Sequence, residues 1–180
     1  MDTRPDTYAD VVGLRVYRNY TSDPIPTTEV DAILEAARWT GSSKNTQKWS
    51  FVVIDDAPGL EALATAGSFT RPILAATLAI AIVWPPDGYE FDIGRVAQNM
   101  MLAAAALGIG SCPVTLHDED RARQVLGVPD GHRCRYAIAL GYPDEAAETA
   151  ERTDRKAAGK GGRKPIGEIA SHRKHESPEV

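Results

Sequence analysis

Apolar residues recur with helical spacing in one N-terminal segment and form continuous runs further along the chain. In residues 28–39 they follow the i, i+3, i+4, i+7 spacing of an amphipathic helix. These positions are Val30, Ile33, Leu34 and Ala37. Residues 49–54 are rich in β-branched and aromatic side chains, and the apolar run 78–83 stops just before a Pro-Pro pair. The pattern predicts a helix over 28–39 and strands over the two later runs.

Residues 93–107 form the most informative predicted helix. After its first two turns this segment carries almost no polar side chain, and it ends at Gly108. A helix that is apolar on all sides must be buried on several of them. In so small a domain a second subunit is a natural cover, so this segment predicts an interface.

Shorter patterns predict the remaining elements, whose order is typical of a mixed α/β or α+β domain. They predict helices at 8–14, 58–65 and 119–126 and strands at 111–115 and 135–140.

Composition limits the class of protein. The 180 residues are 43% apolar and 25% charged, which is typical of one globular domain. The net charge of −5 excludes a whole-chain basic surface that would attract nucleic acid or anionic membranes. The N-terminus lacks the apolar stretch of a signal peptide, and the longest apolar run, residues 73–84, is too short to span a bilayer. We therefore expect a cytoplasmic protein with no nucleic-acid or membrane partner.

Common catalytic motifs are absent from the sequence. It contains neither a G-x-S-x-G elbow nor a G-x-x-x-x-G-K-[ST] loop, and the glycines at 108 and 110 lack the third glycine of a dinucleotide fingerprint. His172 and His175 are separated by two basic residues that repel a cation, so we expect no metal site. Cys112 lies in an apolar strand and is expected to be a small buried hydrophobe.

Candidate anion-binding residues come from distant segments. Arg15 and Arg18 precede a Pro-rich turn, and Arg163 lies far downstream in a charged tail. The guanidinium fork suits a phosphate, although charge counting alone favours solvated surface positions. The run 41–47 offers backbone N–H groups, hydroxyls and amides directly before a strand, which suits either the polar edge of a cofactor or a plain loop.

Several short motifs follow one another in a specific order. They are Arg18-Asn19-Tyr20, Pro24-Ile25-Pro26, Ser42 to Phe51, Asp92 to Gly110, Leu126-Gly127-Val128-Pro129, Ala137 to Pro143 and Arg163-Lys164-Pro165. In this order they resemble the flavin-dependent (FMN) nitroreductase family over residues 11–170.

The resemblance implies an α+β fold, a nitroreductase-like three-layer α/β/α sandwich with a mixed, mainly antiparallel sheet, built as an intertwined homodimer. It places FMN at the dimer interface, touched by both chains. The implied FMN-binding domain covers residues 1–165, and its 142–165 arm wraps the partner subunit. Residues 166–180 are expected to be a partly disordered tail.

The resemblance also implies roles for single residues. Arg15 and Arg18 match basic residues near the FMN phosphate and ribityl chain, and Arg163 matches a late basic residue at the phosphate. Thr115 is the expected catalytic contact, a backbone N–H facing flavin N5. The other expected cofactor-binding residues are Ser42, Ser43 and Asn45 of the partner chain, Gln47 beside them, and Pro113 and Val114 under the isoalloxazine ring.

Several positions depart from the family pattern. Leu14 and Val16 stand where arginine and serine are usual, which removes two phosphate donors. Lys48 replaces a proline and offers one replacement charge, and Leu116 replaces a common glycine beside the flavin. Residues 85–91 are short where many members insert helices over the substrate. These departures predict weaker FMN binding and a more open pocket.

The implied activity is that of an FMN oxidoreductase. Such an enzyme takes hydride from NADH or NADPH and reduces a nitroaromatic, quinone or similar small acceptor by a ping-pong mechanism. Two alternatives stay open. One is a non-catalytic module of the same fold with weakened or absent flavin binding. The other is an FMN enzyme of another reaction type, such as substrate oxidation or dehalogenation.

Overall fold

The computed structural model describes residues 6–173 and divides the chain into two compact units, one ending at Glu148 and the other starting at Thr149. The helices are α1 (Asp6–Gly13), α2 (Thr27–Arg38), the 3-10 turn η1 (Ser43–Asn45), α3 (Ala57–Ala64), α4 (Arg71–Ala75), α5 (Glu90–Ala106), α6 (Glu119–Leu126), α7 (Glu145–Ala157) and α8 (Ile166–Ile169). The strands are β1 (Ser50–Ile54), β2 (Leu78–Trp84), β3 (Gly110–Thr115) and β4 (Arg133–Gly141). No helix of the described part is long and apolar enough to cross a membrane.

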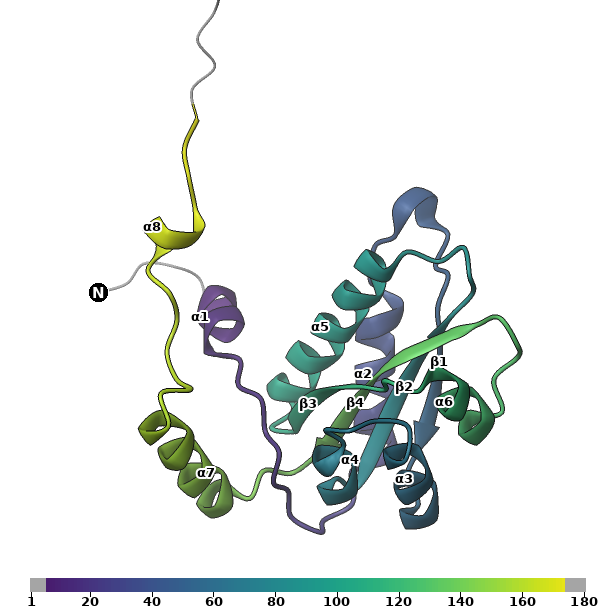
Figure 1. The fold of residues 1–180 in the computed structure, drawn as a ribbon, viewed down its shortest axis with the longest axis horizontal. Helices are drawn as coiled ribbons and strands as arrows, with labels where there is room; N and C mark the ends of the chain where they lie inside the picture. The colour runs from purple at the N-terminus through teal and green to yellow at the C-terminus, as the bar shows by residue number, and fades with distance from the viewer. Residues whose placement is uncertain (1–5, 174–180) are drawn as a thin grey trace, which may run out of the picture. The chain divides into compact units, whose positions relative to one another are not determined.

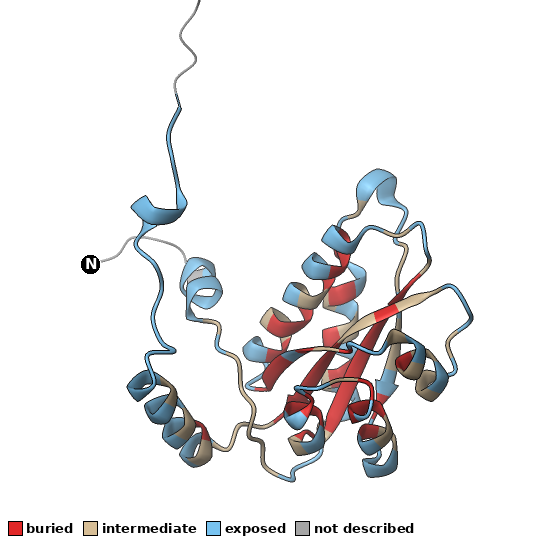
Figure 2. Cartoon of the chain, viewed as in Figure 1, coloured by how far each residue is buried: buried red, intermediate tan, exposed pale blue. Residues whose placement is uncertain are grey.

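One four-stranded sheet, in the order β1-β2-β4-β3, forms the centre of the first unit (Figure 1). Each pairing between described strands is antiparallel, with Leu78 opposite Leu140 and Gly110 opposite Gly141. All seven residues of β2 are buried (Figure 2). The sequence LAIAIVW alternates small side chains toward one face with large ones toward the other, so β2 contributes to both halves of the core.

Helices cover both faces of the sheet. Helices α2 and α5 lie on one face, and α3, α4 and α6 lie on the other (Figure 1). Each layer buries its own cluster, with Ile33 and Met100 in the first and Leu63, Ile73 and Ala122 in the second. The predicted α+β fold with three α/β/α layers is confirmed.

Helix α5 begins three residues earlier than predicted and is not buried on all sides. Ile93, Val96 and Met100 face the sheet and are fully buried. Gly94 and Ala105 face outward and are exposed in the single chain. Helix α5 would therefore be buried on all sides, as the sequence predicted, only if another surface covered its outward face.

An extended segment after α1 packs across the end of the sheet. The backbone N–H of Tyr17 donates to the Ser111 carbonyl at 2.9 Å, and Tyr20 forms an isolated bridge with Pro143. The Tyr20 hydroxyl donates to the Tyr17 carbonyl at 2.6 Å, and burial raises the pKa of this phenol. The phenol therefore stays a neutral donor that fixes the segment.

Two glycines make this close approach possible. A Cβ at Gly110 would lie 2.9 Å from Tyr17 Cβ, and one at Gly141 would lie 2.8 Å from Tyr20 Cβ. Since both contacts involve atoms next to the backbone, a side-chain rotation does not relieve them.

Replacing Gly141 with alanine is expected to lower the free energy of unfolding by about 1–3 kcal/mol, the usual cost of overpacking. Urea unfolding followed by circular dichroism measures the change. Gly167→Ala is the control, because nothing lies within 4 Å of a Cβ at that position. Equal stability of the two variants would contradict the packing argument.

The C-terminal region contains more regular structure than its composition suggested. Helix α7 spans the junction of the two units, and α8 lies inside the expected tail. The domain limit at residue 165 and the wrapping of the 142–165 arm around a partner stay predictions. Residues 174–180, including His175, lie outside the described residues.

Candidate functional site

The free edge of β3 carries the first group of predicted site residues. The Leu116 N–H donates to the Arg135 carbonyl of β4 at 2.8 Å. Because N–H directions alternate along a strand, the N–H of Val114 also faces β4, whereas that of Thr115 faces the free edge. Pro113, which has no N–H, is tolerated in β3 for the same reason.

The side chains of these three residues differ in position. Pro113 is exposed and Thr115 half-buried. Val114 is 4% exposed and packs in the cluster under α3, α4 and α6. Pro113 and the Thr115 N–H are therefore presented at the edge, and the Val114 side chain is not.

Arg15 and Arg18 lie on the segment that crosses the start of β3. The Tyr17–Ser111 hydrogen bond and the close approach of Tyr20 to Gly141 hold this segment at the Gly110 end of the strand. The exposed Arg15 guanidinium donates to the Gly13 carbonyl at 2.8 Å, and Arg18 is half-buried. The segment that bears the two arginines therefore lies at the start of β3, and Thr115 lies at the other end of the same strand.

The loop before β1 carries the second group. Ser42 Oγ accepts the Gln47 backbone N–H at 2.9 Å, and Asn45 Oδ1 accepts Gln47 Nε2 at 3.1 Å. Ser43 is exposed. The φ angles of Lys44, Asn45 and Gln47 are 53°, 53° and 48°. Positive φ is costly for residues with a Cβ, and such strain gathers at binding sites.

The two groups lie at opposite edges of the sheet. β1 and β3 are separated by β2 and β4, which corresponds to roughly 14 Å at the usual strand spacing. A single chain therefore does not bring the 42–47 loop to the Thr115 edge. Arg163 belongs to the second unit, where its guanidinium donates to the Gly162 carbonyl at 3.1 Å.

The departures from the family pattern have definite environments. Leu14 is half-buried and packs against the α2–α5 cluster, so it brings no charge to the edge. Lys48 was expected to replace a phosphate donor that the family pattern has and this chain lacks. Its ammonium group instead forms an ion pair with Asp87. Leu116 is fully buried in the other cluster.

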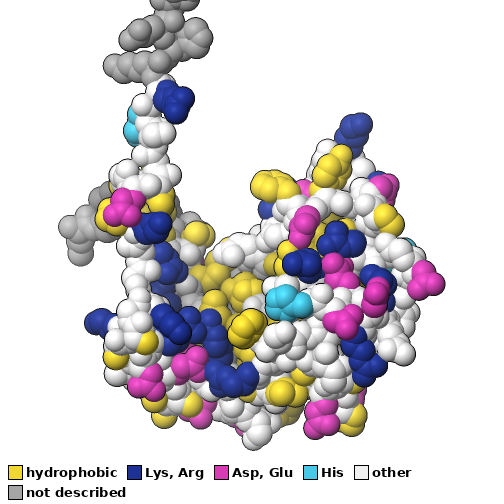
Figure 3. All heavy atoms as spheres, viewed as in Figure 1, with side chains coloured by type: hydrophobic (Ala, Val, Ile, Leu, Met, Phe, Trp, Pro, Cys, Tyr) yellow, Lys and Arg dark blue, Asp and Glu magenta, His cyan; other side chains and the backbone are white. Residues whose placement is uncertain are grey.

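An apolar groove lies between α1 and the C-terminal part of α5. Its volume is about 1110 Å³, and hydrophobic side chains line its floor (Figure 3). Residues that line the groove include Leu102, Ala105 and Ile109. Leu14 and Arg15, from the segment that follows α1, also line it. The outward face of α5 thus continues into an open apolar surface.

The sequence pattern did not reveal the residues around the end of β3. An added Cβ at Gly67 would lie 2.8 Å from the Thr115 carbonyl, so the loop before α4 touches the strand end. Phe69 of this loop is 80% exposed and meets the His117 ring edge-on, with 6.3 Å between ring centroids. The sequence shows no apolar periodicity around Gly67 and Phe69, because both residues lie in the loop between the short helices α3 and α4.

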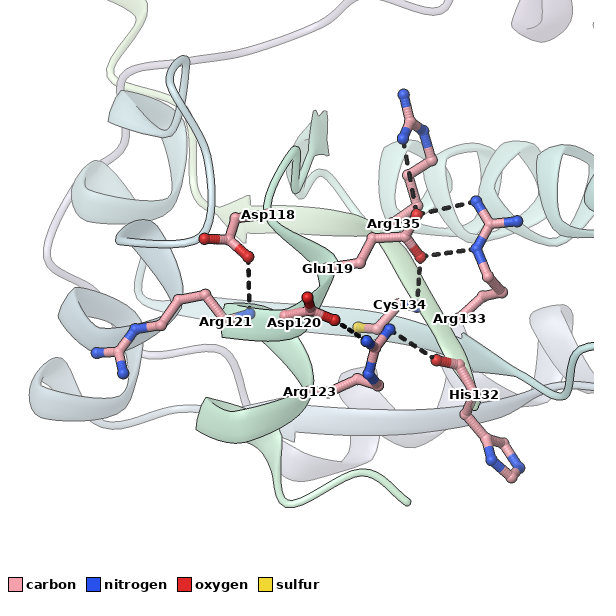
Figure 4. A network of polar contacts seen from close by, with 9 residues as sticks. All are labelled: Asp118, Glu119, Asp120, Arg121, Arg123, His132, Arg133, Cys134 and Arg135. Carbon is pink, nitrogen blue, oxygen red and sulfur yellow. Dashed lines mark hydrogen bonds and ion pairs between the residues drawn. The ribbon is translucent and has the colours of Figure 1, made fainter. Parts of the chain in front are cut away.

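A polar network fixes the start of β4 (Figure 4). Glu119 accepts hydrogen bonds from the Arg133 guanidinium at 2.8 and 2.9 Å and from the Cys134 N–H at 3.2 Å. The Arg133 hydrogen bonds hold the pKa of Glu119 below its usual range. The network anchors α6 to the strand that supports β3.

The structure describes both cysteines and, of the two C-terminal histidines, His172. Cys112 and Cys134 are both buried, and neither forms a disulfide within residues 6–173. Burial raises the pKa of Cys134 to about 12. His172 is exposed. Among residues 6–173, no three His, Cys, Asp or Glu side chains are grouped to hold a metal.

The nitroreductase family model matches residues 14–69 and 85–142. The chain belongs to the nitroreductase family. The match includes the β3 edge, the strained loop and α5, which are the elements described above. It ends at residue 142, before the start of α7.

Individual relatives agree with this membership. An Archaeoglobus fulgidus protein with the provisional name NADH dehydrogenase/NAD(P)H nitroreductase is 29% identical over 152 residues, covering 78% of this chain and 87% of its own. An FMN-dependent nitroreductase from Clostridium difficile R20291 is 27% identical, with a TM-score of 0.72 over 77% of this chain and 88% of that one. A provisional nitroreductase from Desulfovibrio desulfuricans, solved in complex with FMN, is 25% identical, with a TM-score of 0.77 over 97% and 100%.

Proposed function

We propose that this nitroreductase-family chain is an FMN-dependent oxidoreductase that takes electrons from NADH or NADPH and passes them to a small acceptor such as a nitroaromatic or a quinone. The observation that carries the proposal is strand β3, whose last residue has an outward backbone N–H and whose start is crossed by the segment that bears Arg15 and Arg18. The names of relatives that bind FMN or use NAD(P)H support the same cofactors.

The donors at this edge suit the parts of FMN. Arg15 and Arg18 offer guanidinium forks to a phosphate dianion. Pro113 has no N–H, so the Thr115 N–H is the donor at this part of the outer edge of β3. The family resemblance assigns this N–H to flavin N5. When bound, FMN supplies the hydride chemistry, and the protein supplies position and electrostatics. The Thr115 N–H would hold a hydrogen bond to N5 and would stabilise negative charge there.

The second half of the site would come from a second copy of the chain. Ser42, Ser43, Asn45 and Gln47 lie at the far edge of the sheet, so they meet the Thr115 edge only across an interface between copies. The outward face of α5 and the adjoining apolar groove offer a surface for that interface. We therefore propose a homodimer in which each FMN contacts both chains, with Arg163 as a further phosphate donor.

A flavin titration tests this function. The purified protein is expected to bind FMN with a flavin absorption band that NADH or NADPH bleaches under anaerobic conditions. Re-oxidation by a nitroaromatic or a quinone then identifies the acceptor class. A colourless protein that ignores added FMN would instead support the non-catalytic alternative, which the nonpolar Leu14 favours. Flavin binding without bleaching would support another reaction type.

A further inference from the structure

A buried carboxylate holds the arginine-bearing segment in place. Glu148, in the first turn of α7, is 1% exposed. Its Oε1 accepts the backbone N–H of Arg18, the backbone N–H of Asn19 at 2.8 Å and Asn19 Nδ2 at 3.1 Å. Glutamate is almost never fully buried unless it is paired. Three donors on one oxygen make this contact a specific one.

Other elements hold the same segment from different sides. The Tyr17 N–H donates to β3, and the Asn19 carbonyl accepts the Asp144 N–H at 3.1 Å. Asn19 Oδ1 accepts Arg71 from the start of α4 at 2.9 Å. Residues 17–19 are thus fixed between β3, α4 and the start of α7. The position of Arg18 relative to the β3 edge follows from these contacts.

Charge alone does not explain a carboxylate at this place. A negative group beside Arg18 lowers the local positive potential and so opposes the binding of a phosphate dianion. What Glu148 supplies is an acceptor for the backbone N–H groups of Arg18 and Asn19. A buried N–H without an acceptor is costly, and the chain would shift to avoid it.

We propose that Glu148 is a positioning residue for phosphate binding, which fixes the Arg18 backbone so that the guanidinium meets the FMN phosphate. The inference rests on the proposed function, since it assigns Arg18 to that phosphate. It extends the site beyond residue 142, where the family match ends, to α7.

Two substitutions separate geometry from charge. Glu148→Ala removes the acceptor, and we expect it to weaken FMN binding about tenfold or more. Glu148→Gln keeps an oxygen in place of Oε1 and removes the negative charge, so FMN binding is expected to stay within threefold of wild type or to become tighter. Riboflavin lacks the phosphate, so its affinity is expected to stay within twofold in both variants.

The experiment is a fluorescence titration of the full-length protein with FMN and with riboflavin at matched salt, together with thermal melting without flavin. Asp154→Ala is the control, because it removes an exposed carboxylate from the same helix. Tighter FMN binding in both Glu148 variants would show that the residue acts by charge and overturn the proposal. An equal loss of FMN and riboflavin affinity in Glu148→Ala would also overturn it, since the effect would then be general to the fold.

The outcomes distinguish this inference from the proposed function. Failure of wild type to bind either flavin would contradict the proposed function itself and withdraw the inference with it. Wild-type binding that is weakened by Arg18→Ala but unchanged by Glu148→Ala would leave the function standing and reject the positioning role.

Discussion

Thr115→Pro is expected to slow the reduction of bound flavin by NAD(P)H by about 10²–10³-fold, the usual cost of removing one preorganised donor from a reacting centre. The substitution removes the N–H that faces the free edge of β3. It leaves the ladder to β4 intact, because the donors to β4 belong to the alternate residues. Stopped-flow bleaching under anaerobic conditions measures the rate, and flavin titration shows whether FMN still binds.

Thr115→Val is the matched control. It changes the side chain to one of similar shape and keeps the backbone N–H, so its reduction rate is expected to stay close to that of wild type. Equal rates for the proline and valine variants would mean that the Thr115 N–H does not act at the flavin.

Ala105→Glu is expected to convert the proposed homodimer to a monomer and to weaken FMN binding by about 10²-fold or more. Ala105 is exposed in the single chain, and glutamate is a good helix former, so an isolated chain should tolerate the change within about 0.5 kcal/mol. At an apolar interface the same charge would be buried without a partner. In the proposed homodimer, a monomer would lack the partner's 42–47 loop and with it several polar contacts to FMN, each worth about 1 kcal/mol.

Light scattering and FMN titration measure both effects on one sample. Ala57→Glu is the control, because it places the same charge at the exposed first residue of α3, on the opposite face of the sheet. A dimer that survives Ala105→Glu with unchanged FMN affinity would move the interface away from α5 and contradict the shared site.

Strong apolar runs made the centre of the fold predictable. β2 and α5 were visible because long buried elements carry uninterrupted or periodic apolar residues. Helix α4 was missed because it has five residues, with Pro72 in its first turn, and shows no measurable period. The composition of the tail suggested a solvated chain, since the apolar content that marks a core is absent from α7 and its one buried residue is Glu148.

The candidate site was predictable only as separate segments. The family resemblance proposed Arg15, Thr115 and the 42–47 loop as site residues, but sequence order does not reveal that β1 and β3 become opposite edges of one sheet. The positive φ angles of Lys44 and Asn45 were hidden as well, because neither residue is glycine. Side-chain partners such as Asp87 for Lys48 depend on tertiary contacts that spacing does not encode.

The segment beside β3 also bears on the solubility of newly made chains. An edge strand with unpaired N–H and C=O groups is a template for association with other sheets. Here Pro113 removes one donor, and Tyr17 occupies the Ser111 carbonyl. Residues 15–21 are synthesised about ninety positions before β3, so this cover is already present when the strand emerges. An N-terminal truncation that removes residues up to Tyr20 would therefore leave the backbone groups at the outer edge of β3 unpaired and favour aggregation during expression.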